Sequence, residues 1–394
     1  MKGNYIFTSE SVTRGHPDNL CDQVSDAIVD NFLRDDPSSS IVAECALASG
    51  VMFISAHYAS QAKVDMQNIA RDTIREVGYP PKVFNADDCT IMTSFQNHTA
   101  TDYRPLELGN LTSEQIDRIT AKHPATLFGY ACDQTKALMP LPIWLAHRLA
   151  DLLDSREVRK KLPYLLPDGK AQVAIEYANG KPLRIHSISL VTSQTDGATI
   201  ALNQLHSDMV EHVISPVLKK EGFAADEKTH YYVNPEGLLI GGGPAVHSGL
   251  TGRKTGIDTY GEFARHSGAA LSGKDPLRID RIGAYAARYA AKNLVAAGLA
   301  GECEVQLSYT VGSARPISLH VRTFGTGTVD DEALALRLDK AIDFRLGAIV
   351  RDMRLQYLPG EVNGFYGNLA VYGQMGRIDL NVPWEQTDKV AALT

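Results

Sequence analysis

The sequence predicts an α/β protein of the α+β type that is built from more than one domain. Its 394 residues exceed the roughly 100–200 residues of a typical domain. Hydrophobic residues make up 44% and charged residues 22%, which is ordinary globular usage and excludes a disordered chain. Helical and strand-like apolar patterns alternate along the whole length, so helices and sheets are expected in each third of the chain.

The composition excludes several classes of function. The net charge of −7 argues against a nucleic-acid partner, which would attract an excess of basic residues. No apolar run approaches the roughly 20 residues of a membrane helix, and the first residues lack a signal peptide's apolar core. Five scattered cysteines without a CxxC pair indicate a reducing compartment. We therefore expect a cytoplasmic enzyme that acts on a small substrate.

The first third of the chain contains two predicted helices and two predicted strands. Apolar residues recur at helical spacing over 20–32, and Asp35-Asp36-Pro37 ends that run. Apolar stretches at 41–48 and 51–54 are typical of strands in a partly buried sheet. Residues 63–77 predict a second helix, which Gly78 terminates.

The rest of the chain contains one hairpin signal and further helices. Asn179-Gly180 between alternating runs at 172–177 and 181–191 predicts a hairpin with a type I′ turn. Residues 281–297 predict a helix, followed by a strand at 303–309. Thr328 and Asp331 suggest a capping box that opens a helix reaching Ile349. Polar, Gly/Pro-bearing breaks divide the chain into expected domains 1–110, 111–235 and 236–394.

A first candidate site opens the first helix, at Gly15-His16-Pro17-Asp18. Free backbone N–H groups at a helix start attract anions, and His16 with Asp18 could hold a phosphate and its Mg²⁺. Asp18, Asp22, Asp26 and Asp30 follow at i, i+4 spacing on one helix face. The alternative interpretation is a solvated acidic stripe.

Two later segments combine glycines with cations. Gly249–Lys254 follows the glycine-rich residues 241–244, and its glycines would let the backbone approach an anion beside Arg253 and Lys254. It lacks the spacing of a Walker loop, and a tight turn with two exposed cations is the alternative. Residues 272–281 alternate cations with carboxylates, which suits a metal–polyphosphate site or ordinary surface ion pairs. Residues 167–170 alone indicate only a turn.

Together these segments resemble the S-adenosylmethionine synthetase (methionine adenosyltransferase) family over nearly the whole chain. The similar motifs occur in the family's order, at residues 7–12, 15–18, 129–132, 249–254, 258–261, 272–276, 285–289, 384–385 and 387–389. The resemblance implies three similar domains of mixed sheets and helices about a pseudo-threefold axis. It also implies a reaction in which the sulfur of methionine attacks C5′ of ATP and releases triphosphate, which is then cleaved to pyrophosphate and phosphate.

The resemblance also implies roles for individual residues. His16, Lys170, Arg253 and Lys274 are the expected catalytic residues that grip the triphosphate, and Asp168, Lys254 and Ala270 complete the expected ATP site. Asp18 and Asp280 are the expected Mg²⁺ ligands, and Glu44 falls where the family binds a monovalent cation, usually K⁺. The expected assembly is a homodimer or homotetramer whose active sites lie between two subunits.

The chain departs from the family pattern on the acceptor side. His57, His98, His123 and His247 stand where the family has Glu, Gln, Asp and Asp beside methionine, and Arg278 replaces a Lys. A substrate ammonium would lose counter-charges in such a pocket, whereas an anion would gain donors. Methionine is the default acceptor by family membership. The alternatives are an anionic or amine-free acceptor, water, or a weakly active paralogue that binds nucleotide and regulates a true synthetase. Histidines that only pack, or that bind a transition metal, are further interpretations.

Overall fold

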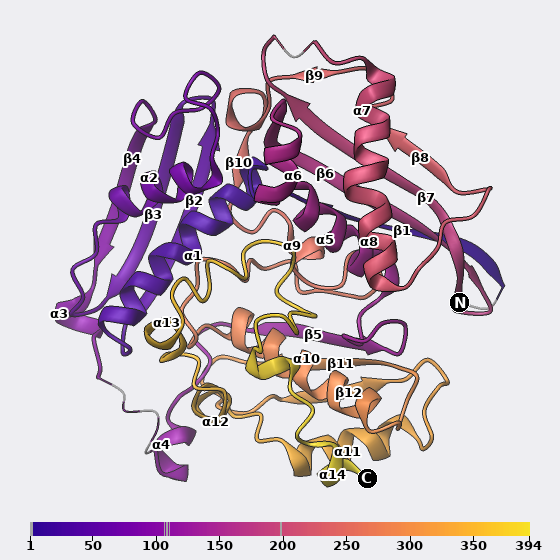
Figure 1. Cartoon of the computed structure of the whole chain (residues 1–394). Helices are drawn as coiled ribbons and strands as arrows, with labels where there is room; N and C mark the ends of the chain where they lie inside the picture. The colour runs from indigo at the N-terminus through magenta and orange to yellow at the C-terminus, as the bar shows by residue number, and fades with distance from the viewer. Residues whose placement is uncertain (1–2, 106, 108, 110, 198) are drawn as a thin grey trace.

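The chain forms three β-sheets that surround a common centre, each with helices on one face (Figure 1). The structure is a computed structural model that describes residues 3–105, 107, 109, 111–197 and 199–394. Mixed sheets with covering helices confirm the predicted α+β class. In the part of the chain so described, no helix is long and apolar enough to cross a membrane.

The first sheet is built mainly from the N-terminal third. Its strand order is β10-β2-β3-β4, in which β2 and β3 are antiparallel and β4 runs parallel to β3. Helices α1 and α2 pack on one of its faces because each presents an apolar stripe to the sheet. The bounds are β2 (Ser40–Ala48), β3 (Val51–Ala59), β4 (Thr90–Asn97), β10 (Gly249–Leu250), α1 (Pro17–Asp35), α2 (Met66–Val77) and α3 (Thr99–Asp102).

The second sheet has the order β1-β6-β7-β8, with β9 also paired to β7. The predicted hairpin is confirmed: Asn179 and Gly180 both have positive φ, as a type I′ turn requires, and the strands extend beyond the predicted ranges. The bounds are β1 (Asn4–Val12), β6 (Leu165–Ala178), β7 (Lys181–Gln194), β8 (His230–Val233), β9 (Leu239–Ile240), α5 (Leu141–Leu153), α6 (Arg156–Lys161), α7 (Leu202–Met209) and α8 (Ser215–Glu221), with a π-helical turn, η2 (Val210–Ile214), between the last two.

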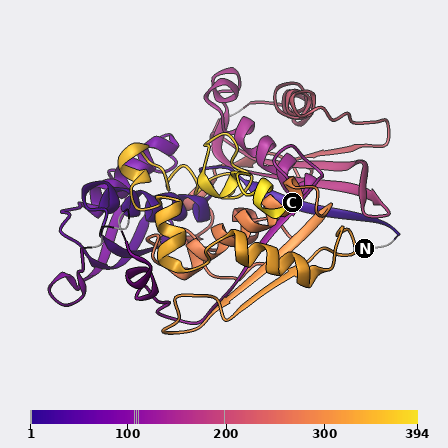
Figure 2. The same cartoon turned by 90° about the horizontal axis from the view of Figure 1, so that it is seen from below.

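The third sheet has the order β12-β11-β5, and the buried helix α10 packs on it (Figures 1 and 2). The predicted helix at 281–297 and strand at 303–309 are confirmed within two residues. The bounds are β5 (Ala125–Cys132), β11 (Glu302–Tyr309), β12 (Ser318–Arg322), α10 (Ile279–Ala296), α11 (Asp331–Ala341), α12 (Leu346–Asp352) and α14 (Val390–Leu393); shorter pieces are α4 (Ser113–Asp117), η3 (Gly243–Ala245), α9 (Thr255–Asp258), α13 (Leu358–Glu361) and η4 (Pro383–Glu385).

The predicted capping box at Thr328 and Asp331 is wrong. The N-cap of α11 is Asp330, which makes no side-chain capping bond. The Asp331 carboxylate instead accepts from the Thr323 hydroxyl at 2.5 Å, so it ties the helix to the end of β12. The helix also stops at Ala341, and the chain resumes as α12 at Leu346.

Each sheet includes a strand from a different segment of the sequence. The N-terminal strand β1 pairs with β6, so it belongs to the sheet of the central segment. Strand β5 pairs with β11, so it belongs to the sheet of the C-terminal segment. Strand β10 pairs with β2 of the N-terminal segment. The expected boundaries near 110 and 235 stay predictions, and no sheet is contained within one of the expected segments.

The acidic residues of α1 form a buried spine, which overturns the solvated-stripe interpretation. Asp18, Asp22, Asp26 and Asp30 are all buried. Together they accept backbone N–H bonds from three distant segments. Asp18 and Asp22 accept from Leu250 at 3.0 Å and Gly252 at 2.7 Å, Asp26 accepts from Gly273 at 2.8 Å, and Asp30 accepts from Tyr366 and Gly367 at 2.9 and 2.8 Å. The i, i+4 spacing therefore attaches both candidate phosphate loops to a single helix.

Asp258 lies next to this spine, and it is expected to make stability fall as the pH rises. Burial, followed by the charge of Asp26, raises the pKa of the Asp258 carboxyl to about 8. The native state therefore holds a proton that the unfolded chain releases near pH 4, so native stability is lost as pH rises towards 8, by at most about 1.4 kcal/mol per pH unit. Asp258→Asn removes this titration, and its Tm relative to wild type should rise between pH 5 and pH 8. Asp72→Asn on the exposed surface is the control, and parallel Tm curves for wild type and Asp258→Asn would contradict the assignment.

Candidate active site

The N-terminus of α1 presents a neutral histidine. His16 is the N-cap residue, and its Nδ1 accepts from the Asp18 N–H at 3.2 Å. Burial lowers the pKa of the imidazole to about 4, so it is uncharged near pH 7. Because Nδ1 accepts, the ring proton resides on Nε2, which can donate to an anion.

His247 and Asp168 lie beside this histidine. The His247 ring contacts the His16 ring at 4.9 Å between centroids, and its Nε2 is 2.8 Å from Oδ2 of Asp168. The same carboxylate oxygen accepts from the Gly243 N–H at 2.7 Å. One oxygen of the Asp168 carboxylate therefore contacts both the Gly243 backbone and the His247 imidazole.

The segment Gly249–Lys254 supplies the cations next to Asp18. Lys254 Nζ is 2.7 Å from Asp18 Oδ2, and Arg253 lies 3.8 Å from Oδ1. Gly249 has no room for a Cβ, which would overlap the Pro17 carbonyl, so glycine lets this segment reach the helix start. Ala270 packs in the same way on Gly252.

Lys170 projects from β6 close to this group. Its Nζ is 2.7 Å from Oε2 of Glu10 on the neighbouring strand β1. The turn that precedes Lys170 is fixed by the Thr13 hydroxyl, which donates to the Pro167 carbonyl at 2.6 Å and accepts from the Gly169 N–H at 2.8 Å. The residues described so far form the first cluster: His16, Asp18, Asp168, Lys170, His247, Arg253 and Lys254.

A second cluster gathers at the start of α10. Lys274 Nζ is 2.6 Å from Asp280 Oδ2, and His123 Nε2 is 3.2 Å from the same oxygen. Arg278 is the N-cap residue of α10, and its guanidinium reaches Asp275 and the Ser40 hydroxyl, each at 3.3 Å. The backbone of Lys274 pairs with Val42 at the edge of β2.

His57 and His98 form a ring pair on the same sheet. Their centroids lie 5.9 Å apart with the planes inclined by 17°. His57 is opposite Val42 in the β2–β3 ladder, so its side chain shares a face with Val42. Lys274 pairs with Val42 from the other edge of β2, which places it about 10 Å from His57 across the sheet. Glu44 is exposed two residues further along β2. His57 and His98, with Lys274, Asp280, His123 and Arg278, complete the second cluster.

The four acceptor-side histidines do not converge within one chain. His57, His98 and His123 belong to the second cluster, whereas His247 belongs to the first. Lys274 and Leu250 pair with β2 four residues apart, at Val42 and Ala46, which corresponds to about 13 Å along the strand. The structure also shows no group of three or more His, Cys, Asp or Glu side chains arranged to hold a metal among the residues it describes. A transition-metal site within one chain is therefore not supported.

Several supporting residues have no recognisable signal in the sequence. The Tyr79 hydroxyl donates to the Gly15 carbonyl at 2.5 Å and so holds the residue before His16. Tyr79 lies outside every motif, and only the three-dimensional fold brings it there. Thr13 also lies outside the motifs, and its hydroxyl holds the turn that precedes Lys170.

Three family models match most of this chain, one for each of its three segments. Family models for the N-terminal, central and C-terminal domains of S-adenosylmethionine synthetase match residues 4–100, 118–239 and 241–386. The S-adenosylmethionine synthase of Synechococcus sp. (strain JA-3-3Ab) is 45% identical, covering 98% of this chain and 97% of the relative. That of Synechococcus elongatus (strain ATCC 33912 / PCC 7942 / FACHB-805) is 44% identical over 100% of this chain and 98% of the relative.

The chain is therefore an enzyme of the methionine adenosyltransferase type. It belongs to the S-adenosylmethionine synthetase family, which confirms the resemblance seen in its motifs. A third relative, the S-adenosylmethionine synthase of Trichodesmium erythraeum (strain IMS101), is 42% identical over 100% of this chain.

Proposed function

We propose that the protein transfers the adenosyl group of ATP to the sulfur of methionine or a related acceptor. A sulfur lone pair forms the bond to C5′, the C5′–O5′ bond breaks, and triphosphate leaves with the electron pair. The sulfur becomes a sulfonium, and the triphosphate is then hydrolysed to pyrophosphate and phosphate. The observation that supports this most is the pair of lysine–aspartate contacts, Lys254–Asp18 and Lys274–Asp280, at 2.7 and 2.6 Å.

The leaving group explains why the site needs fixed positive charge. Negative charge builds on the triphosphate as C5′–O5′ breaks, and preorganised cations stabilise it best. Lys170, Arg253, Lys254 and Lys274 are the donors in this proposal, together with the Nε2–H of His16. A neutral His16 can donate without a counter-charge, and its hydrogen bond from the Asp18 N–H fixes the ring orientation.

The carboxylates of Asp18 and Asp280 fit Mg²⁺ as ligands. Mg²⁺ prefers hard oxygen donors and keeps several waters, so it needs only one or two protein carboxylates together with phosphate oxygens. In each pair a lysine ammonium contacts one carboxylate oxygen. A polyphosphate that binds there can become the partner of the lysine and leave the carboxylate oxygen to the ion. The ion would neutralise triphosphate charge. The proposed place of K⁺ is Glu44, a single exposed carboxylate.

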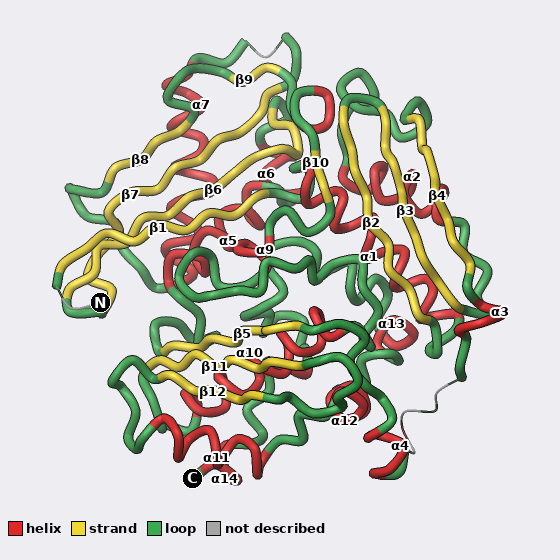
Figure 3. The backbone as a smooth tube through the Cα atoms, turned by 180° about the vertical axis from the view of Figure 1, so that it is seen from behind, coloured by secondary structure: helices red, strands yellow, loops and turns green. Residues whose placement is uncertain are grey.

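We also propose that two chains complete each active site in a cytoplasmic homodimer or a homotetramer made from it. The sheets turn their uncovered faces to the same side of the molecule (Figure 3). On the first sheet that face exposes Val51, Phe53 and Met92, at 42%, 40% and 54%, and His57 shares it. A second copy packed there would bring its first cluster towards His57 and Lys274.

The product of purified protein with ATP and Mg²⁺ tests this proposal. Mass spectrometry should detect an adenosyl sulfonium that depends on the acceptor, with triphosphate-derived pyrophosphate and phosphate. Chelation should abolish turnover, because the triphosphate charge is then unscreened, and Mg²⁺ alone should restore it. Adenosine formed without acceptor would instead indicate transfer to water. Recovery only with Zn²⁺ would contradict the assignment of Asp18 and Asp280.

A further inference from the structure

A cavity of about 720 Å³ lies beside the second cluster, and its charge is unbalanced. Its lining residues include Arg104, Arg118, Lys122 and Arg278, and among the described residues that line it Asp102 is the only acid. The chain as a whole carries a net charge of −7, so this concentration of cations is local. An anion that occupies the space would reduce the repulsion among these four cations.

These cations have few protein partners. The side chains of Arg118 and Lys122 make no ion pair or hydrogen bond with any described residue. Among the described residues, Arg104 donates only to the Tyr103 carbonyl, at 2.7 Å, and Arg278 lies 3.3 Å from Asp275. Within the described part of the chain, Arg104, Arg118 and Lys122 therefore have no carboxylate partner.

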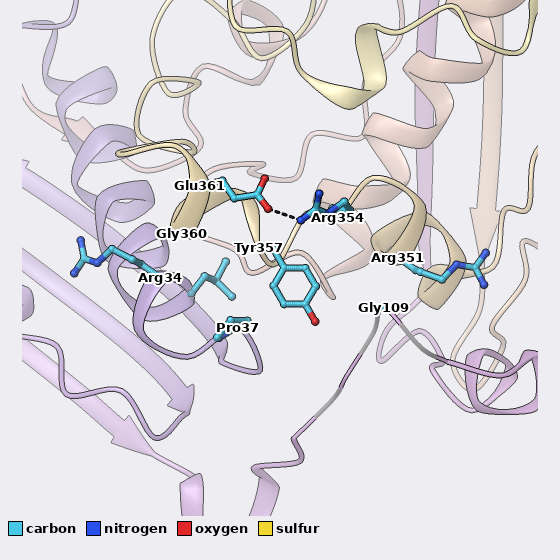
Figure 4. Close-up of a pocket in the computed structure, with 9 residues that line it drawn as sticks. Arg34, Pro37, Gly109, Arg351, Arg354, Tyr357, Gly360 and Glu361 are labelled. Atoms are coloured by element: carbon cyan, nitrogen blue, oxygen red, sulfur yellow. Dashed lines mark hydrogen bonds and ion pairs between the residues drawn. The ribbon is translucent and has the colours of Figure 1, made fainter.

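A second cavity, of about 570 Å³, provides an internal comparison (Figure 4). It is lined by Arg34, Arg351 and Arg354, but each of these has its own acid. Arg34 pairs with Asp35 at 3.0 Å, Arg351 pairs with Asp352 at 2.6 Å, and Arg354 pairs with Glu361. Clustered arginines are therefore common to both cavities. The 720 Å³ cavity differs because, among the described residues, most of its cations have no carboxylate partner.

The 720 Å³ cavity adjoins the acceptor side of the proposed active site. Ser40 and Ala59, which face each other in the β2–β3 ladder, line it. The pair Val42 and His57 lies two residues along the same face, about 7 Å away, and Lys274 is beside Val42. His98 precedes α3, whose last residue lines the cavity, and His123 follows Lys122 directly. One extended molecule can therefore contact both regions.

We propose that this cavity binds an acid group of the acceptor, so that the preferred acceptor is a thioether with net negative charge. The inference rests on the proposed adenosyl transfer and specifies its substrate class. Arg278 is shared by the cavity and the acceptor residues, while Arg104, Arg118 and Lys122 extend the positive surface outward. His57, His98 and His123 supply neutral or positive imidazoles where a substrate ammonium would need carboxylates.

An acceptor series with graded charge tests the proposal. Methionine has no net charge, N-acetylmethionine has one negative charge, and N-succinylmethionine has two. The terminal amide of N-succinylmethionine has the same size as the last compound and one charge fewer. We expect kcat/KM to rise at least tenfold from the amide to N-succinylmethionine, and methionine to be the poorest acceptor.

Variants connect that preference to the cavity. Arg118→Gln/Lys122→Gln should remove most of the difference in kcat/KM between N-succinylmethionine and its amide. Arg351→Gln in the charge-balanced cavity is the matched control and should keep the preference. A preference for methionine, or a charge preference unchanged in the double variant, would overturn the proposal.

A binding experiment distinguishes a failure of the proposed adenosyl transfer from a failure of the cavity assignment. If no acceptor yields a sulfonium, calorimetry with a non-hydrolysable ATP analogue and Mg²⁺ measures binding of N-succinylmethionine and of its amide. Tighter binding of the dianion that the double variant abolishes would support the cavity assignment without adenosyl transfer. Equal binding would reject it. Inorganic triphosphate is also tested as a competitor. If it displaces N-succinylmethionine in wild type but not in the double variant, the cavity binds a phosphate product instead.

Discussion

Replacing Lys274 or Arg253 by alanine is expected to lower turnover by about 10²–10³-fold, because each removes a preorganised donor to the triphosphate. Lys274 comes from the segment before α10 and Arg253 from the segment after β10, so the two changes test both clusters. The effect should appear mainly in kcat, since charge on the leaving group grows towards the transition state. Steady-state assays of pyrophosphate and phosphate release measure it.

Arg75→Ala is the control for this experiment. Arg75 pairs with Asp72 and Asp87 on the exposed side of α2, outside both clusters, and its loss should leave turnover unchanged. Circular dichroism and Tm establish that the variants are folded. If Lys274→Ala and Arg253→Ala both retained near-full turnover, the assignment of the nucleotide site would be wrong.

Arg281→Met is expected to have the largest effect on stability. Arg281 and Asp26 are both fully buried, and one guanidinium nitrogen lies 2.8 and 2.7 Å from the two carboxylate oxygens. Removing one partner leaves a buried unpaired charge, which costs about 3–5 kcal/mol of the free energy of unfolding. Arg281 also donates to the Lys274 carbonyl at 2.8 Å, so turnover should fall as well.

A double variant separates the charge effect from lost packing. Arg281→Met/Asp26→Leu removes both charges and should recover part of the stability, because no ion remains unpaired in the interior. Urea unfolding of the two variants and of the exposed Arg75→Met provides the comparison. A loss of stability in Arg281→Met no greater than in Arg75→Met would refute the role assigned to this ion pair.

Local elements of this fold could be predicted because local chemistry specifies them. Asn179-Gly180 determines a turn that needs positive φ at both residues, and the apolar period over 20–32 determines a helix. The acidic face of the same helix is compatible, by spacing alone, with the alternative of a solvated stripe. Its carboxylates are buried because distant backbone N–H groups satisfy them, and no spacing within the helix reveals those partners.

In the candidate site, too, residues within local motifs could be predicted, whereas their grouping by distant strand pairing could not. Motifs located His16, Lys254 and Lys274, since each lies in a glycine-bearing segment with its own signature. The grouping of the histidines into two clusters depends on how β2, β10 and residue 274 pair, which is non-local. The cations of the 720 Å³ cavity are dispersed between residues 104 and 278, so sequence inspection had no reason to connect them.

The exchange of strands among the three sheets has a consequence for synthesis on the ribosome. Strand β1 is synthesised first, but its partner β6 follows more than 150 residues later. Strand β10, which pairs with the edge of β2, is synthesised about 200 residues after β2. Likewise β5 finds its partner only when β11 has been translated. No sheet can reach its final pairing until residues well past the middle of the chain have left the exit tunnel. Nascent chains arrested near residue 240 should therefore be degraded readily by protease, whereas chains released at full length should resist it.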